Sequence, residues 1–227
     1  MKNRHIFNRT FAFGISKKTL VAMAITATFP CVAMAGPSLG IGYSNIGLSG
    51  HSGRPGVSIS VGNLYSNNAV ASGSASFARG YYGMNADLGK MIPAGGVSFE
   101  PYVSLGFLNL NYNQTVPGGI VTSHPYPFVT QYSQSYVQQP ASITDFYGLA
   151  GANMNIPLGQ KVALLFGGGY GHTFMNMNGN GGAVYQGKAE IGFEVARHVT
   201  ANLNVRYVHV PGASLTSEGV GLAYHFS

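Results

Sequence analysis

The sequence predicts an all-β protein: an eight-stranded antiparallel up-and-down transmembrane β-barrel with an N-terminal extension. Three observations predict this class. Apolar and polar residues alternate from Val57 to the end of the chain, the connections alternate between short and long, and only 8% of the residues are charged. A chain that crosses a membrane with strands of about 9–11 residues must close them into a barrel, because an open sheet leaves backbone groups unpaired in lipid.

Residues 1–35 carry the pattern of a cleaved signal peptide. A basic start without acids is followed by the apolar run Leu20 to Phe29 and by Ala33-Met34-Ala35. These features predict export, with cleavage after Ala35, and the apolar run is too short for a membrane-spanning helix. The chain's one cysteine, Cys31, lies in this segment, so we expect no disulfide and no thiol chemistry in the exported protein.

The net charge of +6 arises largely from this first segment. The remainder is nearly neutral, which excludes the basic surface of a nucleic-acid-binding protein. We divide the chain into the signal peptide 1–35, an N-terminal extension or seam segment 36–55, and the barrel 56–227. For the segment 36–55, an added strand, a place in the lumen and a periplasmic position all stay open.

Eight strands are predicted at residues 56–66, 74–89, 97–112, 143–156, 161–175, 183–196, 199–210 and 217–226. The connections 91–96, 157–160 and 197–198 are short, whereas those at 67–73, 113–142, 176–182 and 211–216 are mostly longer and polar. Short periplasmic turns and longer extracellular loops are typical of an outer-membrane barrel. We therefore expect the protein in the outer membrane.

The two faces of the strands differ in chemistry. On 199–210, for example, Leu203 and Val205 alternate with Asn204 and Arg206. The scarce charges fall mostly on the polar parity, and because the interior of an eight-stranded barrel is filled by side chains, we expect opposite charges to pair there. The predicted interior charge network is Arg79, Asp87, Glu100, Asp145, Lys188, Glu190, Glu194 and Arg206.

The last stretch, 219–227, is predicted to close the barrel against the strand that begins near Val57. Val220, Leu222, Tyr224 and Phe226 share one face. Tyr224 and Phe226 are the expected terminal signal for the barrel-assembly machinery, since aromatic residues form girdles at the two membrane interfaces.

These features resemble a known group. The signal, the turn Ile156-Pro157-Leu158-Gly159 and the terminal Leu222-Ala223-Tyr224-His225-Phe226 resemble the small outer-membrane barrels of Gram-negative bacteria, the OmpA-transmembrane, OmpX and opacity-protein group. Within it, Tyr43-Ser44-Asn45-Ile46-Gly47 followed by 56–63 looks like the start of a YfaZ-type barrel. The resemblance implies an integral protein surrounded by outer-membrane lipid, and we expect a monomer.

No catalytic, cofactor or metal residues are predicted. The histidines lie singly, without the spacing that places two metal ligands on one face. His172, His209 and Glu218 are expected near the extracellular rim, but no serine accompanies His172 in the sequence. We therefore expect a protein that is not an enzyme and has no cofactor, while a lipid A-modifying enzyme stays as an alternative.

The long connection 113–142 is the predicted functional segment. No Asp, Glu, Lys or Arg occurs from Pro101 to Thr144, yet the loop holds Tyr126, Phe128, Tyr132 and Tyr136. Uncharged, tyrosine-rich loops suit adhesive contacts, because tyrosine joins a rigid apolar ring to a polar tip. The expected role is structural or surface-interacting, with a host or surface ligand, and a porin-like narrow channel for small solutes is the further alternative.

Overall fold

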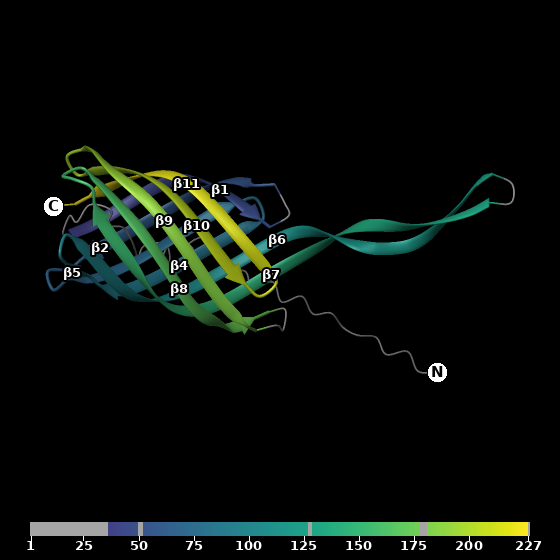
Figure 1. Ribbon diagram of the computed structural model, residues 1–227, viewed down its shortest axis with the longest axis horizontal. Helices are drawn as coiled ribbons and strands as arrows, with labels where there is room; N and C mark the ends of the chain where they lie inside the picture. Colours follow the sequence, from purple (N-terminus) through teal and green to yellow (C-terminus); the bar gives the residue numbers. More distant parts are fainter. Residues whose placement is uncertain (1–35, 50–51, 127–128, 178–180, 227) are drawn as a thin grey trace, which may run out of the picture.

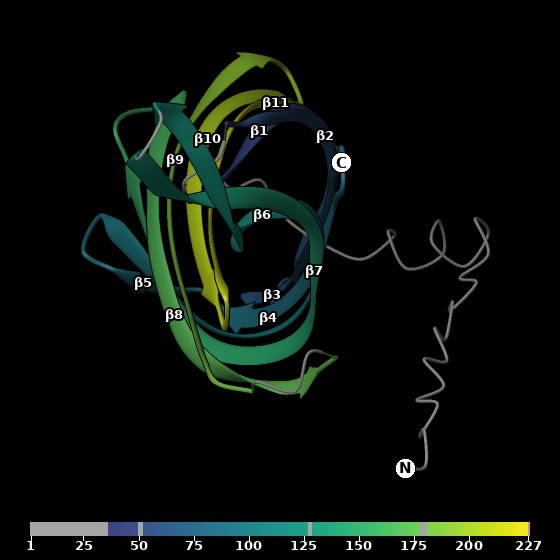
Figure 2. The ribbon, with the colours of Figure 1, turned by 90° about the vertical axis from the view of Figure 1, so that its right-hand side faces the viewer.

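The computed structural model describes residues 36–49, 52–126, 129–177 and 181–226, with only the backbone described at 122–126 and 129–131. These residues form eleven strands, ten of which close an antiparallel barrel (Figures 1 and 2). The ring closes because β4 pairs with β6, while the short β5 pairs only with the start of β6. The strands are β1 (Gly36–Leu48), β2 (Arg54–Leu64), β3 (Ala69–Ala78), β4 (Tyr81–Lys90), β5 (Ile92–Ala94), β6 (Val97–Tyr126), β7 (Val129–Pro157), β8 (Val162–Asn176), β9 (Ala183–Ala196), β10 (Val199–Val210) and β11 (Ala213–His225).

The prediction of eight barrel strands is wrong, and two features account for the difference. The segment placed in an N-terminal extension contains β1, a full barrel strand. The predicted strand 74–89 is two strands, β3 and β4, separated by a turn at Arg79 and Gly80. Gly80 has a φ of 69°, a conformation that glycine adopts without steric cost.

The two ends of the barrel are distinguished by the β6–β7 hairpin, which projects far beyond one of them (Figure 1). We call this the hairpin end and the opposite one the turn end. The connection predicted at 67–73 as a long loop lies at the turn end, where Tyr65–Asn68 form a tight turn and β3 begins at Ala69. The one predicted at 211–216 is the two-residue turn Pro211–Gly212 at the hairpin end.

The seam of the barrel lies between β1 and β11. Ser38 is opposite His225 and Leu48 is opposite Leu215, and the Phe226 amide donates to the Pro37 carbonyl over 2.9 Å. The expectation that the terminal strand pairs with the strand near Val57 is therefore wrong, since β1 lies between them.

The outward face carries an apolar band around the middle of the barrel. Ile41, Leu88 and Leu105 are each more than 60% exposed, which is uncommon for large apolar side chains in contact with water. Toward the hairpin end the band finishes in paired rings, with centroids 6.0 Å apart for Phe77 and Tyr82. Aromatic rings at the edge of an apolar band are typical of membrane barrels.

Close to the hairpin end, the apolar and polar faces exchange sides. On β6, the outward residues change from Val103 and Leu105 to Asn109, while Leu108 and Leu110 point inward and are buried. The same exchange occurs on β1, β10 and β11, where inward apolar residues accompany the outward Asn45, His209 and Thr216. This end of the barrel therefore has an apolar inside and a polar outside, as a water-soluble protein does.

Candidate functional site

The lumen is filled at the hairpin end by one apolar cluster, which we call the apolar layer. Its members come from six strands around the ring, so they meet across the lumen. Leu110, Val184 and Val210 are at most 1% exposed. The layer consists of Ile46, Leu48, Tyr102, Leu108, Leu110, Ile143, Tyr147, Leu149, Val184, Val210, Ala213 and Leu215.

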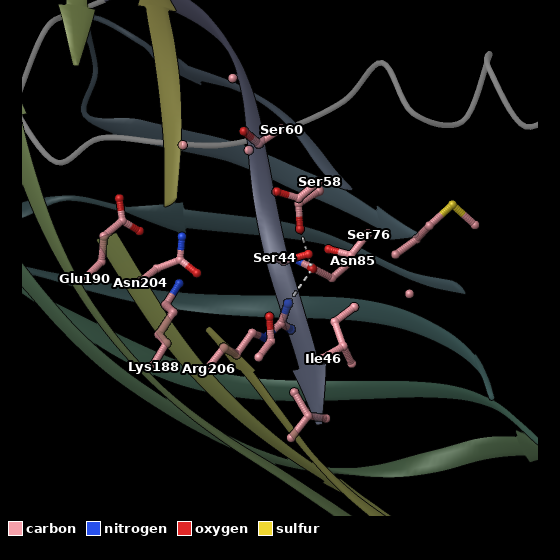
Figure 3. A pocket seen from close by; sticks show the side chains of 18 of the residues that line it. Ser44, Ile46, Ser58, Ser60, Ser76, Asn85, Lys188, Glu190, Asn204 and Arg206 are labelled. Carbon is pink, nitrogen blue, oxygen red and sulfur yellow. Dashed lines mark hydrogen bonds between the residues drawn. The ribbon is translucent and has the colours of Figure 1, made fainter. Parts of the chain in front are cut away.

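A cavity of about 140 Å³ lies beside this layer. Leu108 and Leu215 of the layer line it, together with polar side chains from the middle of the barrel. Figure 3 shows serines of β1, β2 and β3 on one side of the cavity and longer side chains of β9 and β10 on the other. The small wall comprises Gly40, Gly42, Ser44, Ser58, Ser60, Ser74 and Ser76.

Arg206 is the centre of a hydrogen-bond network across the lumen. Its guanidinium donates to the Asn85 Oδ1 atom over 2.8 Å and to the Gln186 Oε1 atom over 2.7 Å. Gln186 in turn donates to the Tyr102 hydroxyl over 2.9 Å, and Asn85 accepts from Ser74 over 2.8 Å. The network therefore joins β3, β4, β6, β9 and β10 through side chains, which stiffens the ring.

The carboxylates of the lumen accept hydrogen bonds from neutral groups. Asn153 donates to Glu100 over 3.1 Å, Asn202 donates to Glu190 over 3.0 Å, and Ser104 donates to Asp87. Asn85 connects the Asp87 carboxylate to the Arg206 guanidinium, because its amide donates to one and accepts from the other. The Asn85 amide thus links two charges, Asp87 and Arg206, that the sequence suggested would pair directly.

The other predicted network residues occupy different environments. Lys188 lies over the Tyr102 ring, with the Nζ atom 5.3 Å from the centroid, a cation–π distance. Asp145 is fully buried beside the apolar layer and accepts from Asn176. Glu194 is half-buried opposite Thr200 near the turn end, and Arg79 is exposed in the β3–β4 turn. The structure brings together Asp87, Glu100, Lys188, Glu190 and Arg206, and leaves Arg79 outside the lumen.

The hairpin arm, residues 111–142, is the second candidate site. Beyond Leu110 and Thr144, β6 and β7 pair with each other up to the Tyr126–Val129 pair, and with no other strand in the described part of the chain. About sixteen residues of strand correspond to a reach of about 50 Å. The arm carries Tyr126, Tyr132 and Tyr136, while Phe128 lies outside the described residues.

The base of the arm is fixed to the barrel. Arg54 donates to the Asn111 carbonyl over 2.8 Å and to the Arg79 carbonyl over 3.0 Å. The Asn111 amide donates to the Gly80 carbonyl over 2.7 Å, and the Asn109 amide side chain donates to Thr144 over 2.7 Å. These bonds hold the arm's direction where it leaves the ring.

One face of the arm presents large exposed side chains. Tyr132 and Tyr136 stand four residues apart on β7 and therefore on one face, and they are 70% and 67% exposed. Ile120 is opposite Gln134, on the same face, and is 72% exposed. This face, which we call the tyrosine face, offers apolar contact without any charge.

A polar cluster lies on the outward face of the hairpin end. The His209 Nδ1 atom is 2.9 Å from the Ser214 Oγ atom, and the Tyr207 hydroxyl donates to that same oxygen over 3.1 Å. The Tyr185 ring stacks on His209 with centroids 4.5 Å apart. His209 could be singled out in the sequence but Ser214 could not, because the two-residue turn at 211–212 sets these positions opposite each other.

His172, the other rim histidine considered, contacts the backbone carbonyl of Thr173 over 2.7 Å. Within the described ranges, no group of three or more His, Cys, Asp or Glu is placed to hold a metal ion. No helix in those ranges has the length and apolar character to cross a membrane.

Comparisons with known proteins show the fold. No family model and no curated protein matches the sequence. Among solved structures, the outer-membrane protease OmpT from Escherichia coli has 8% identity and a TM-score of 0.50, covering 84% of this chain and 94% of that one. The NanC porin has 8% identity and a TM-score of 0.46, covering 83% and 100%.

The translocator domain of the autotransporter NalP from Neisseria meningitidis has 12% identity and a TM-score of 0.42, covering 86% of this chain and 90% of that one. Identities this low show the fold alone. With its ten-membered ring and outward apolar band, the described part of the chain has the fold of an outer-membrane β-barrel.

Proposed function

We propose that the protein is a surface-interaction protein whose barrel anchors and displays the hairpin arm. The observation that carries the proposal is the tyrosine face: three large side chains, each at least two-thirds exposed, on an arm without charge. In outer-membrane barrels the long loops are extracellular, so the arm points away from the cell. Exposed tyrosines give apolar contact area at low cost in side-chain entropy.

The barrel suits this role because it holds the arm at a fixed angle. Arg54 and Asn111 bind the arm base to neighbouring strands, whereas an isolated two-stranded hairpin is only marginally stable in water. A fixed base lowers the entropy lost when the arm contacts a partner.

An adhesion experiment tests the proposal. Cells that display the full chain are compared with cells displaying a variant in which residues 114–139 are replaced by Asn-Gly, a turn that fits between the opposed Asn113 and Pro140. The probes are an epithelial monolayer and immobilised extracellular-matrix protein. We expect adhesion to both probes to fall to the level of cells without the protein, while heat-modifiable migration shows an intact barrel.

Point variants locate the contact. The double substitution Tyr132→Ser and Tyr136→Ser removes the two rings, and Gln114→Ser with Gln139→Ser is the matched control on the opposite face. The tyrosine variant is expected to lower adhesion at least tenfold and the control to leave it within twofold. Equal adhesion of the two variants would remove the proposed role of the tyrosine face.

A second candidate function is hydrolysis of a lipid acyl ester at the outward rim. The supporting observation is the 2.9 Å contact between the Ser214 hydroxyl and the His209 ring, since a serine becomes a nucleophile when an adjacent base takes its proton. In this reaction the Ser214 Oγ atom attacks the ester carbonyl and its proton passes through His209 to the departing alcohol. Water then releases the acyl group from the serine.

Mass spectrometry of lipid A and phospholipids tests the second candidate. Cells expressing the chain are expected to lose an acyl chain from one of these lipids, and the Ser214→Ala variant is expected to restore the full pattern. His172→Ala is the matched rim control and should change nothing. Identical lipids with and without the wild-type chain would end this candidate.

A further inference from the structure

The polar interior and the apolar layer divide the lumen into two regions. In the middle, Ser44, Asn202 and Arg206 line the cavity. At the hairpin end, the aliphatic side chains of the layer meet from β1, β6, β7, β9, β10 and β11. Asp145, which bonds to its amide partner, and Thr173 are buried beside them, and Tyr102 connects the layer to the polar region through Gln186. A solute moving along the lumen would therefore meet a polar region and then an apolar barrier.

Unpartnered polar atoms mark a path through the polar region. The Arg206 Nε, Ser44 Oγ and Asn202 Oδ1 atoms are buried and have no hydrogen-bond partner among the residues that the structure describes. Ser38 and Asn155, which face inward near the turn end, also have buried side-chain atoms of this kind. Buried polar groups in proteins are satisfied by protein or by water, and a cavity of about 140 Å³ has room for several water molecules.

The charges along this path favour cations. Asp87, Glu100 and Glu190 face the lumen, against Lys188 and Arg206. A lumen with surplus negative charge attracts cations and repels anions, because the surrounding protein has a low dielectric constant.

We propose that the barrel contains a cation pathway that the apolar layer keeps closed. A constriction lined by apolar side chains closes a pore by excluding water, without a plug or a moving loop. Leu110 and Val210 are among its most deeply buried members, at 1% and 0% exposure, and they reach the layer from strands that are not neighbours in the ring. Their removal would join the hydrated lumen to the outer surface.

Single-channel recording in planar bilayers with potassium chloride tests the gate. The wild-type chain is expected to give no resolved openings, and the double variant Leu110→Gly and Val210→Gly to give steady openings at least tenfold above the baseline noise. Leu110→Met with Val210→Ile keeps the layer apolar and filled and is expected to stay closed. Ile120→Gly on the arm is a control outside the lumen.

Heat-modifiable migration selects the variants whose barrel is intact. Should the double variant fail to fold, Leu215→Ser, at a layer residue that also lines the cavity, serves as the opening variant. Steady openings of the wild-type chain, or silence of every folded opening variant, would overturn the gate.

The reversal potential in a tenfold potassium chloride gradient tests the selectivity. An opened variant is expected to favour potassium, and adding Glu100→Gln and Glu190→Gln should reduce that preference at least twofold. A preference for chloride would overturn the cation pathway. Neither measurement depends on the hairpin arm, so the gate and the proposed surface role succeed or fail separately.

Discussion

The two ends of this barrel are built in opposite ways. Through the middle and the turn end, polar side chains such as Glu100 and Asn153 face inward and Leu105 faces outward. At the hairpin end, Leu110 faces inward and Asn109 faces outward. The alternation of side chains thus gives an apolar outside where lipid surrounds the middle and a polar outside where water surrounds the hairpin end. The level at which the apolar and polar faces exchange marks the boundary between lipid and water.

The two regions of the lumen are also filled in different ways. Polar side chains fill the middle by hydrogen bonding, which leaves a cavity of about 140 Å³. Apolar side chains fill the hairpin end by close packing, with Val184 and Val210 fully buried. Substitutions in the polar middle and in the apolar layer should therefore differ in how much they lower the free energy of unfolding.

The largest effect is expected in the apolar layer. Leu110→Ala should lower the free energy of unfolding by about 2–5 kcal/mol, because it leaves a cavity among packed side chains. Ile120→Ala on the arm is the control, since an exposed site usually changes stability by less than about 0.5 kcal/mol. Urea unfolding in lipid vesicles measures both, and a loss below about 1 kcal/mol for Leu110→Ala would show a loosely packed hairpin end.

The outward face provides the second test. Leu105→Arg lies within the apolar band and should cost about 2–4 kcal/mol, as a cation facing the lipid does near the bilayer midplane. Thr216→Arg points outward above the band and should cost no more than about 1 kcal/mol. If the two variants lowered the free energy of unfolding in lipid vesicles by similar amounts, the membrane boundary would lie elsewhere.

The polar network of the lumen provides the third test. Arg206→Met removes the bonds to Asn85 and Gln186 and should cost about 1.5–3 kcal/mol, the range for hydrogen bonds to a charged group. Arg79→Met, in the exposed β3–β4 turn, should change stability by less than about 0.5 kcal/mol. An Arg206→Met variant as stable as the wild type would mean that the network contributes no net stability.

The smallest effect concerns the room that a glycine gives to a buried ring. A Cβ atom at Gly106 would overlap the Tyr147 ring, whereas one at Gly187 would meet nothing within 4 Å. Gly106→Ala should therefore cost about 1–3 kcal/mol through overpacking, and Gly187→Ala should be tolerated. Equal stability of the two variants would contradict the packing of Tyr147.

Much of the fold could be predicted from the sequence, because successive side chains of a strand point to opposite faces. Alternating apolar and polar residues therefore reveal a strand with one apolar face. The number of strands could not, since the turn at Arg79 and Gly80 interrupts a continuous run of alternating residues. The outward parity changes across this turn, from Phe77 to Tyr82, and that change is the signal that reveals it. β1 was missed because its inward positions, such as Gly40 and Gly42, lack the bulk or charge expected of a lumen wall.

Of the candidate sites, the arm could be predicted from the sequence and the apolar layer could not. The arm is visible in the sequence as a long uncharged stretch with tyrosines. The apolar layer is not visible in the sequence, because inward Leu108 directly follows outward Phe107 and the two apolar neighbours hide the change of face. The neighbouring Asn109 and Asn111 are the signal that the faces have exchanged. The role of Tyr224 and Phe226 in assembly stays a prediction, although their rings pack edge to face with centroids 5.0 Å apart.

The most direct test of this architecture is the accessibility of a cysteine placed beneath the apolar layer. Ser58→Cys, in the cavity wall, and Gln114→Cys, exposed on the arm, are introduced separately into a Cys31→Ser background. Intact cells are then treated with a membrane-impermeant maleimide. This architecture predicts rapid labelling at position 114, at least a hundredfold slower labelling at position 58, and rapid labelling at both in the presence of Leu110→Gly and Val210→Gly. Equal labelling of the two sites beneath an intact apolar layer would contradict it.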